Sequence, residues 1–400
     1  MHSERVWCDV LILGAGAVGI SVGIAYLNAN PSSKVVIVDK EDTLGKHASG
    51  RNSGVLHAGF YYSPDSLKAK FCHEGNRVLR TLIRRYSIPL RETGKVVVAR
   101  NDEEDLRLEA LFDRGVQNRV DLELLEESKL SQFEPLATTK NRFLWSPTTA
   151  VSDPKLVIAA LRREFVDLGG QIYLSEKVRL KISGDEIHDS SNKFDARLIV
   201  NAAGAQSDRI SREIGVGNEY AMLPFMGSYR FTSQKHLPIK RLVYPVPHKI
   251  NPFLGVHFTI TVDGLVKIGP TAIPVGGREQ YSLREGWSLK DIVQATKASH
   301  AIVKGKTHDL PSILKAEWPK VIRSNLVRES AQLVPSSVSV GDWKLRPPGI
   351  RSQLVHLPSG NLEQDFVIRE RLNSIHILNA VSPGWTCALP FGTWIVEKYL

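Results

Sequence analysis

DVLILGAGAVG, residues 9–19, decides the fold of this chain together with VVIVDK, residues 35–40. An apolar run enters a G-x-G-x-x-G turn, a helix-compatible segment follows, and a second apolar run ends in an acid. Gly14 permits the tight turn, Gly16 lets the backbone approach a pyrophosphate, and Gly19 lets the helix pack closely on the strand. Because strand, turn, helix and terminal acid all agree, this unit predicts a dinucleotide-binding site.

The acid at the end of the second apolar run completes the dinucleotide prediction. Asp39 lies twenty residues after Gly19, where a carboxylate accepts hydrogen bonds from a ribose diol. The N–H groups at the start of the intervening helix are free to face the phosphates. Besides the three glycines, the residues of this unit that we expect at the nucleotide are Ala17, Val18, Asp39 and Lys40.

The next segment distinguishes between dinucleotides. Residues 46–62, KHASGRNSGVLHAGFYY, are dense in small residues, hydroxyls and amides, where an NAD domain usually continues with another strand and helix. Such a loop suits a flavin nucleotide lying extended across the domain. LIVNAAGA at 198–205 resembles a buried strand ending in a turn that brings backbone close to a ligand. Both segments favour FAD, with contacts expected from Ser49, Arg51, Asn52, Ser53, Gly54, Val178, Ala203 and Gly204.

Length and composition are those of a globular chain. Four hundred residues exceed one ordinary hydrophobic core, so two domains are expected. A hydrophobic content of 42% and a charged content of 24% exclude a disordered chain. The three cysteines, Cys8, Cys72 and Cys387, have neither metal-ligand spacing nor a pairing pattern. Their distribution predicts a reducing compartment and no metal site.

The start of the chain and its charge bear on location and partners. Eight residues precede the first strand, too few for a signal or transit peptide, so a cytoplasmic location is expected. The net charge is +10, with basic clusters at 235–241 and 304–306. Such clusters indicate a solvated surface or attraction of a dianionic substrate or the anionic inner face of a membrane. No RNA- or DNA-binding motif accompanies the charge, so we expect no nucleic-acid partner.

Local patterns predict several further elements. A strand at 94–99 and a helix at 102–114 follow from apolar periodicity, and Asp153 and Pro154 suit the N-cap and first position of a helix. Strand character returns at 171–174 and at Val178, and the chain ends in a helix-like segment at 391–399. The stretch 224–342 is rich in strand patterns and proline turns and is expected to form most of a substrate-facing sheet.

Family-like motifs run in order along almost the whole chain. They are GRNSGVLHAG at 50–59 with Tyr61 and Tyr62, SLKAK at 66–70, GK at 94–95, YPVP at 244–247, PFLGVHFT at 252–259, IGP at 268–270, GIRSQ at 349–353 and NAVSP at 379–383. On these motifs the chain resembles the L-2-hydroxyglutarate dehydrogenase/oxidase family, within the D-amino-acid-oxidase-like flavoprotein superfamily.

The resemblance implies an α/β fold in which an FAD-binding Rossmann-like domain is interleaved with a β-rich substrate-binding domain. We expect the FAD-binding domain at 1–90, 150–215 and 345–400, and the substrate-binding domain at 91–149 and 216–344. The implied activity is FAD-dependent oxidation of an L-2-hydroxy acid, L-2-hydroxyglutarate to 2-oxoglutarate, by hydride transfer to the flavin. A quinone or oxygen would then accept the electrons.

Such a reaction needs a base for the hydroxyl proton, cations for the carboxylate, and a C2–H bond directed at the flavin. Histidine has a suitable pKa, so His57 and His257, in the two most family-like loops, are the candidate bases, against a structural role for each. Arg351 is the favoured carboxylate anchor because a guanidinium binds carboxylates bidentately. The further catalytic candidates are Lys70, Lys95, Tyr62 and Tyr229.

Two departures from the family pattern bear on the substrate. Met226 stands where the family usually has arginine, and Trp385 lies in the 382–390 loop, where the family has alanine. That loop is expected beside the flavin ring, with contacts from Pro383, Gly384, Trp385 and Thr386, although Trp385 also suits a core position. The alternatives are a flavin-dependent amino-acid or secondary-amine oxidase, which the same scaffold supports, and a role on nucleic acid, motivated by charge alone.

Overall fold

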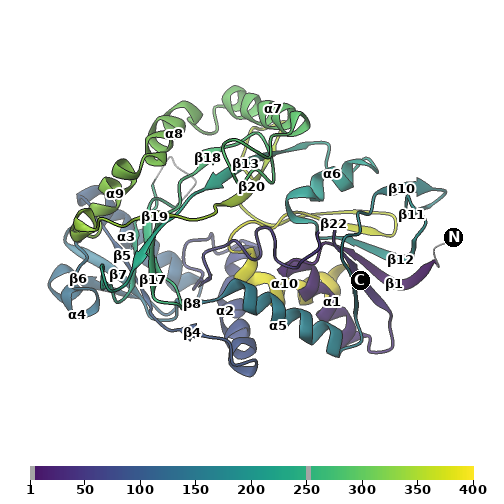
Figure 1. Cartoon of the computed structure of the whole chain (residues 1–400), viewed down its shortest axis with the longest axis horizontal. Helices are drawn as coiled ribbons and strands as arrows, with labels where there is room; N and C mark the ends of the chain where they lie inside the picture. Colours follow the sequence, from purple (N-terminus) through teal and green to yellow (C-terminus); the bar gives the residue numbers. More distant parts are fainter. Residues whose placement is uncertain (1–4, 249–253) are drawn as a thin grey trace.

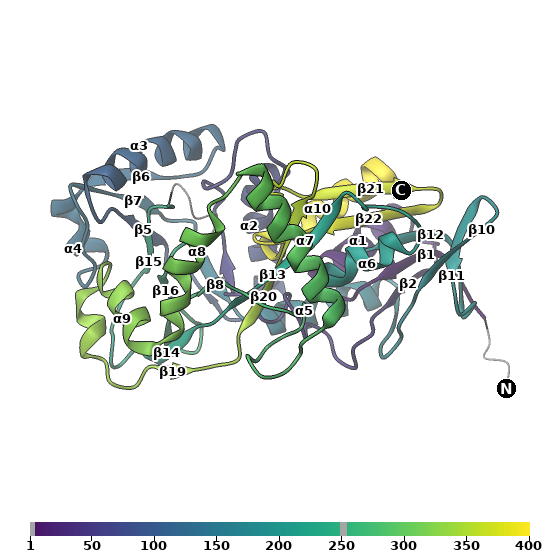
Figure 2. The same ribbon diagram turned by 90° about the horizontal axis from the view of Figure 1, so that it is seen from above.

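The computed structural model describes residues 5–248 and 254–400. Two large sheets lie at opposite ends of the molecule, with a smaller sheet between them (Figures 1 and 2). We call the six-stranded sheet with its helices the nucleotide part, and the eight-stranded sheet with its helices the β-rich part. Pro252 and Phe253, in one of the family-like motifs, lie outside the described residues.

The sheet of the nucleotide part has the strand order β21-β22-β12-β1-β2-β9. Neighbouring strands pair in parallel, except that β21 runs antiparallel to β22. Parallel neighbours require connections that cross over the sheet, so that each strand starts at the same end of the sheet. The strands are β1 (Val6–Leu13), β2 (Val35–Val38), β9 (Gln171–Tyr173), β12 (Phe194–Asn201), β21 (Val367–Arg371) and β22 (Ser374–Asn379).

Both faces of this sheet are covered. Along β1, Val10 and Ile12 join one hydrophobic core, whereas Leu11 and Leu13 join the core on the opposite face, as expected for a strand buried on both sides. The first core is packed by α1 (Ala17–Ala29), α2 (Leu67–Arg85), α5 (Pro154–Asp167) and α10 (Gly384–Tyr399). The hairpin of β10 (Leu180–Ser183) and β11 (Glu186–Asp189) and helix α6 (Ser207–Arg212) lie on the other face.

The sheet of the β-rich part has the order β19-β14-β17-β16-β15-β5-β7-β6. Short runs of β-branched residues such as Val96–Val98 form its buried centre. Its strands are β5 (Lys95–Val98), β6 (Glu123–Glu126), β7 (Arg142–Ser146), β14 (Arg230–Ser233), β15 (Leu242–Pro245), β16 (His257–Ile260), β17 (Leu265–Gly269) and β19 (Lys344–Leu345). Helix α3 (Asp102–Gln117) and the short α4 (Leu130–Phe133) lie at this end (Figure 2).

Two small sheets join the large ones. The central sheet consists of β13 (Tyr220–Gly227), β18 (Ile273–Pro274) and β20 (Gly349–His356), and the other of β3 (Val55–Leu56), β4 (Leu90–Arg91) and β8 (Ala150–Ser152). Helix α7 (Leu289–Gly305) packs on the β13–β20 pair, and α8 (Leu310–Glu317) and α9 (Arg323–Ala331) continue toward the β-rich end (Figure 1). The domain boundaries expected from the sequence stay a prediction.

Comparison with the expected elements gives confirmations and corrections. The dinucleotide unit, the strand at 95–98, the helix at 102–117 and the start of α5 with Asp153 as N-cap are confirmed. Val178 lies in irregular backbone between β9 and β10, and 289–331 is largely helical. The signal for this helical stretch was present in the sequence, because Ala298, Ala301 and Ile302 recur at helical spacing and are buried on one face of α7.

The C-terminal helix is longer than expected. Helix α10 begins at Gly384, with Cys387 N donating to Pro383 O, so Trp385 and Thr386 lie in its first turn rather than in a loop. Pro390, the last residue of the loop expected at 382–390, lies inside the helix. Among the described residues, no helix combines the length and apolarity needed to cross a bilayer.

Candidate active site

A cavity of about 770 Å³ runs from the carboxyl end of β1 to the first turn of α10. The loops that follow β1, β2 and β12 form one end, and β13, β20 and the 270–272 loop form the other. The volume is that of a pocket for a cofactor or another small molecule. Ligands of open α/β sheets bind at this place, beyond the carboxyl ends of the strands.

The turn after β1 forms the narrow floor of the nucleotide end. Gly14 has φ +110°, and a Cβ atom there would lie 2.6 Å from a backbone oxygen beyond β12, so glycine is required. The backbone N–H of Ala15 donates to Asp39 Oδ2 at 2.8 Å, and that of Ala17 donates to Ser49 Oγ at 3.0 Å. These bonds fix a carboxylate and a hydroxyl beside the N-terminus of α1.

Most of the residues predicted to bind the cofactor line this cavity. They are Gly14, Gly16, Ala17, Val18, Asp39, Lys40, Ser49, Asn52, Ser53, Val178, Ala203, Gly204, Pro383, Gly384, Trp385 and Thr386.

Three of the predicted cofactor residues lie outside the cavity lining. A Cβ atom on Gly19 would lie 2.0 Å from Gly14 O, so this residue serves helix-on-strand packing. A Cβ atom on Gly54 would meet a backbone oxygen of β8 at 2.3 Å. Arg51 places its guanidinium over the ring of Tyr281, 4.0 Å from the centroid, and donates from Nε to Lys46 O.

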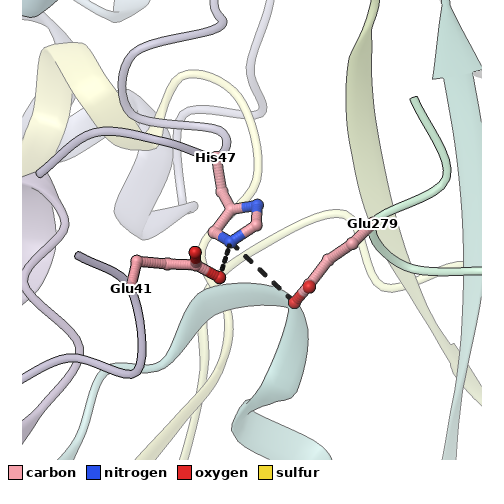
Figure 3. A group of neighbouring side chains, drawn as sticks. All are labelled: Glu41, His47 and Glu279. Carbon is pink, nitrogen blue, oxygen red and sulfur yellow. Dashed lines mark hydrogen bonds and ion pairs between the residues drawn. The ribbon is translucent and has the colours of Figure 1, made fainter. Parts of the chain in front are cut away.

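Charged side chains that the sequence analysis missed meet at the nucleotide end (Figure 3). His47 Nε2 lies 2.9 Å from Glu41 Oε1 and 3.9 Å from Glu279 Oε1. Burial alone would raise the pKa of Glu41, but hydrogen bonds from Lys40, Lys46 and His47 outweigh it and lower this pKa to about 2. Glu279 comes from a distant segment, so spacing in the sequence could not have indicated this group.

His57, Tyr229 and Arg351 line the opposite end of the cavity. His57 follows β3, Tyr229 follows β13, and Arg351 lies on β20. Burial lowers the pKa of His57 to about 3, and the nearby Lys95, His257 and Arg351 add to this effect. The imidazole is therefore neutral near pH 7, and its Nδ1 has no hydrogen-bond partner in the described part of the chain.

His257, the other candidate base, lies outside the cavity lining. Its ring stacks on Tyr244 with the centroids 3.9 Å apart, and its Nδ1 lies 2.8 Å from Gly255 O. Burial lowers the pKa of His257 to about 3 although this hydrogen bond opposes the shift. Because Nδ1 donates to a carbonyl, Nε2 is the nitrogen of the neutral ring that carries no proton.

Two buried lysines add positive charge near this end. Lys95, a predicted candidate, is fully buried, with Nζ 4.5–4.7 Å from three aromatic rings and no hydrogen-bond partner within the described ranges. Lys267, which the sequence analysis missed, donates from Nζ to Ser53 O at 2.7 Å. Burial lowers the pKa of each to about 7. A lysine inside an apolar strand was the available signal for Lys267.

The remaining candidates occupy other positions. Lys70 is exposed on α2, with Nζ 5.4 Å from the Phe71 ring centroid, because α2 turns this face to solvent; it is not brought to the cavity. Tyr62 is partly buried near Arg351 but does not line the cavity. Met226 is buried in a small apolar cluster with Val275 and Ile350, also outside the cavity lining.

The cavity fits a flavin dinucleotide on two grounds. At one end, the glycine turn leaves room that a Cβ atom would fill, beside the N-terminus of a helix. At the other end, Trp385 Nε1 and His57 Nδ1 are buried polar atoms in the lining, and neither has a hydrogen-bond partner in the described residues. Buried polar atoms of this kind require a partner.

The fold and cavity define the class of protein, and comparison with known proteins agrees. A family model described as FAD dependent oxidoreductase matches residues 9–398, and the chain belongs to that family. It is therefore an enzyme, and its cofactor is FAD.

Relatives place the chain more narrowly. It is 32% identical to the L-2-hydroxyglutarate dehydrogenase of Escherichia coli strain K12, and 34% identical to the mitochondrial L-2-hydroxyglutarate dehydrogenase of Caenorhabditis elegans. Each match covers 98% of this chain and 92% of the relative. The resemblance to the L-2-hydroxyglutarate dehydrogenase family is thereby confirmed.

Solved structures share the fold. An L-α-glycerophosphate oxidase from Mycoplasma pneumoniae with FAD bound has a TM-score of 0.76 at 21% identity, covering 98% of this chain and 95% of that chain. A glycine oxidase from Geobacillus kaustophilus has a TM-score of 0.71 at 17% identity, covering 98% and 94%. The predicted fold, with a Rossmann-like FAD domain and a second domain, is confirmed.

Proposed function

We propose that the enzyme oxidises an L-2-hydroxy acid to the 2-oxo acid, with L-2-hydroxyglutarate as substrate and 2-oxoglutarate as product. The observation that carries this proposal is that Arg351 and neutral His57 line one end of the cavity, with the buried Lys95 and Lys267 behind the lining. Such a site suits a dianion that must lose a proton and a hydride. The names of the relatives support the same substrate.

When bound, FAD supplies the hydride acceptor for C2 of the substrate. The residues that would hold its nucleotide end are the Gly14–Val18 turn, Asp39 and Ser49, and those at the other end are His57 and Pro383–Thr386. The helix N-terminus of α1 favours the negative charge of a pyrophosphate.

His57 is the base that we propose. It lines the cavity, is neutral near pH 7, and has an unpartnered Nδ1 among the described residues. A substrate carboxylate near the imidazole would raise its pKa and so favour transfer of the hydroxyl proton to the ring. His257 is a positioning residue in this proposal, because it lies outside the lining and is bonded to Gly255 O.

Arg351 and Tyr229 would hold the carboxylate next to the reacting carbon. The guanidinium offers two parallel donors and the phenol one more. Burial raises the pKa of Tyr229 to about 12, so the hydroxyl stays protonated and able to donate. The ammonium groups of Lys95 and Lys267 would compensate the second carboxylate of a dicarboxylic substrate.

An anaerobic bleaching panel tests this assignment. The enzyme is mixed with L-2-hydroxyglutarate, D-2-hydroxyglutarate, L-lactate, L-glutamate and sarcosine, and the flavin absorbance is followed. We expect rapid bleaching by L-2-hydroxyglutarate alone, because the two carboxylates and one face of C2 are both recognised. Bleaching by L-glutamate or sarcosine without L-2-hydroxyglutarate would contradict the proposal and favour an amine oxidase.

We also propose that the enzyme contacts an anionic membrane surface through α7. Trp287, Leu289, Val293 and Val303 are exposed on or beside this helix, with Leu289 82% exposed. Lys290, Lys297 and Lys304 recur every seven residues and are exposed along one side. Apolar side chains flanked by a row of lysines suit an interface with anionic lipid.

Sedimentation with vesicles of phosphatidylglycerol and phosphatidylcholine tests this contact. Leu289→Glu should weaken binding severalfold, whereas Leu106→Glu, an equally apolar exposed position on α3, should not. Salt should release the wild-type enzyme. Equal loss in both variants, or self-association in place of vesicle binding, would contradict the contact. Vesicles that contain a quinone would also show whether the quinone, rather than oxygen, reoxidises the flavin.

A further inference from the structure

One segment between the central sheet and α7 crosses onto the nucleotide part. Residues 276–281, which we call the strap, connect β18 to α7. Arg278 is 2% exposed and donates to Asp208 of α6, to Asp291 of α7 and to Ala205 O. The side chain therefore ties the strap to both helices through a buried ion network.

Glu279 connects the segments that follow the two strands on either side of β1. Its carboxylate accepts from Lys40 Nζ at 3.0 Å and from Gln206 Nε2 at 2.7 Å. Lys40 follows β2 and Gln206 follows β12, and β1 lies between these two strands in the sheet. A carboxylate that is bonded on both sides must cross above the turn after β1, where the dinucleotide would bind.

Tyr281 makes a second connection. Its hydroxyl lies 2.6 Å from His47 Nδ1, and its ring lies under the guanidinium of Arg51. His47 in turn contacts Glu41 and points toward Glu279 (Figure 3). Glu279, Tyr281, Glu41 and His47 all line the cavity. The strap thus bonds to the loops after β2 and β12 and to the 47–51 loop.

Glu41, His47 and Glu279 also have the composition of a metal-ligand group. The cation positions beside them are already taken, because Lys40 contacts both carboxylates and Lys46 Nζ lies 2.6 Å from Glu41 Oε2. Two ammonium groups balance two carboxylates. The cluster is therefore an ion-pair lock rather than a vacant metal site.

We propose that the strap is a retention clamp for the dinucleotide, and that its bonds from Glu279 and Tyr281 set the rate at which FAD leaves the cavity. The turn after β1, Glu279 and Tyr281 line the same cavity, so a dinucleotide bound at that turn would be held in by these bonds until they open. The proposal rests on FAD occupying the cavity as described under the proposed function. It adds residues from the segment between β18 and α7 to those that control the cofactor.

The test is the rate of FAD release from the holoenzyme, followed by flavin fluorescence after dilution. Glu279→Ala should release FAD at least about tenfold faster than wild type, the factor expected for loss of one charge-assisted hydrogen bond. Tyr281→Phe removes one oxygen and should accelerate release less. Rising salt should accelerate release in wild type and have less effect in Glu279→Ala, because the ion pair with Lys40 is partly exposed.

Glu219→Ala is the matched control. Glu219 forms a comparable ion pair with Arg369 at 3.1 Å but lies outside the cavity lining, so its loss should leave release unchanged. Wild-type release rates in both strap variants would overturn the clamp, as would faster wild-type release in EDTA, which would indicate a metal instead. A wild-type enzyme that holds no FAD would instead contradict the proposed function.

Discussion

The two ends of the cavity handle charge in opposite ways. At the nucleotide end, Glu41 and Glu279 are matched by Lys40 and Lys46 within hydrogen-bond or ion-pair distance, and the groups are partly exposed. At the substrate end, Lys95 is fully buried and has no hydrogen-bond partner in the part of the chain that the structure describes. Compensated charge holds protein segments together, whereas uncompensated buried charge is costly unless a ligand supplies the opposite sign.

The difference fits the two proposed roles, retention of the cofactor at one end and recognition of the substrate at the other. A matched network can close over a ligand and reopen in salt. At the other end, burial disfavours the charged forms of His57, Lys95 and Lys267 and lowers the pKa of each. An anionic substrate bound there would favour the charged forms. The predictions below disturb each end in turn.

The largest effect is expected at the floor of the nucleotide end. In Gly16→Val the new side chain would meet Ser49, since even a Cβ atom would lie 3.0 Å from Ser49 Oγ, and it would block the approach of a pyrophosphate. We expect purified protein with almost no FAD, measured as flavin released on denaturation. Gly341→Val is the control, because a Cβ atom there would meet no atom of the described residues within 4 Å. Normal flavin content in Gly16→Val would contradict the assignment of the turn.

The nucleotide end is also the part of the candidate site that the sequence predicted well. The spacing of Gly14, Gly16, Gly19 and Asp39 is local, and each residue acts through backbone geometry that a single strand–turn–helix unit defines. Glu279 escaped prediction because 238 positions separate it from Glu41 along the chain, and only the return of the strap brings them together. The spacing of residues that are close in the sequence predicts such turns, whereas contacts between distant segments depend on tertiary packing.

Substitutions at the substrate end distinguish the two candidate bases. His57→Asn should lower kcat by a factor of about 10²–10⁴, the usual contribution of a general base, while FAD content stays normal. His257→Asn should lower kcat much less, because His257 lies behind the cavity lining. Stopped-flow reduction under anaerobic conditions measures both. If His257→Asn is the slower enzyme, the base is His257 and the roles proposed here are reversed.

Sequence reasoning placed His57 and His257 in equivalent loops and could not separate them. The difference arises from tertiary position: His57 faces the cavity, whereas His257 packs on Tyr244. Lys70 shows the same limit of sequence reasoning, here for a candidate that the structure leaves outside the site. It lies in a family-like motif, but the helix turns it to solvent while neighbouring Lys68 and Ala69 are buried.

A smaller effect is expected at the carboxylate anchor. Arg351→Lys keeps the charge but loses the planar pair of donors. If the contact is equal in ground and transition states, KM should rise roughly tenfold with little change in kcat. Steady-state kinetics with L-2-hydroxyglutarate measures both constants. Lys70→Met, a change at an exposed lysine, should leave KM unchanged; an unchanged KM in Arg351→Lys would remove Arg351 from the site.

The smallest expected effect is a proton coupled to substrate binding. Burial lowers the pKa of Lys267 and of Lys95 from 10.5 to about 7. A bound dicarboxylate opposes this effect and raises both pKa values. Between pH 7 and 10.5, binding therefore takes up protons, and affinity falls as pH rises through this window.

Calorimetric titration with glutarate, an unreactive dicarboxylate, measures this uptake. At about pH 8, the binding enthalpy should vary with the ionisation enthalpy of the buffer and give a net uptake of up to about one proton per lysine. Lys267→Met should reduce that uptake, because one of the two lysines is removed. The nucleotide end provides the contrast: Glu279→Ala should leave proton uptake unchanged, since the lowered pKa of Glu279 keeps this carboxylate ionised at this pH. Uptake that disappears in Glu279→Ala but persists in Lys267→Met would reverse the comparison between the two ends.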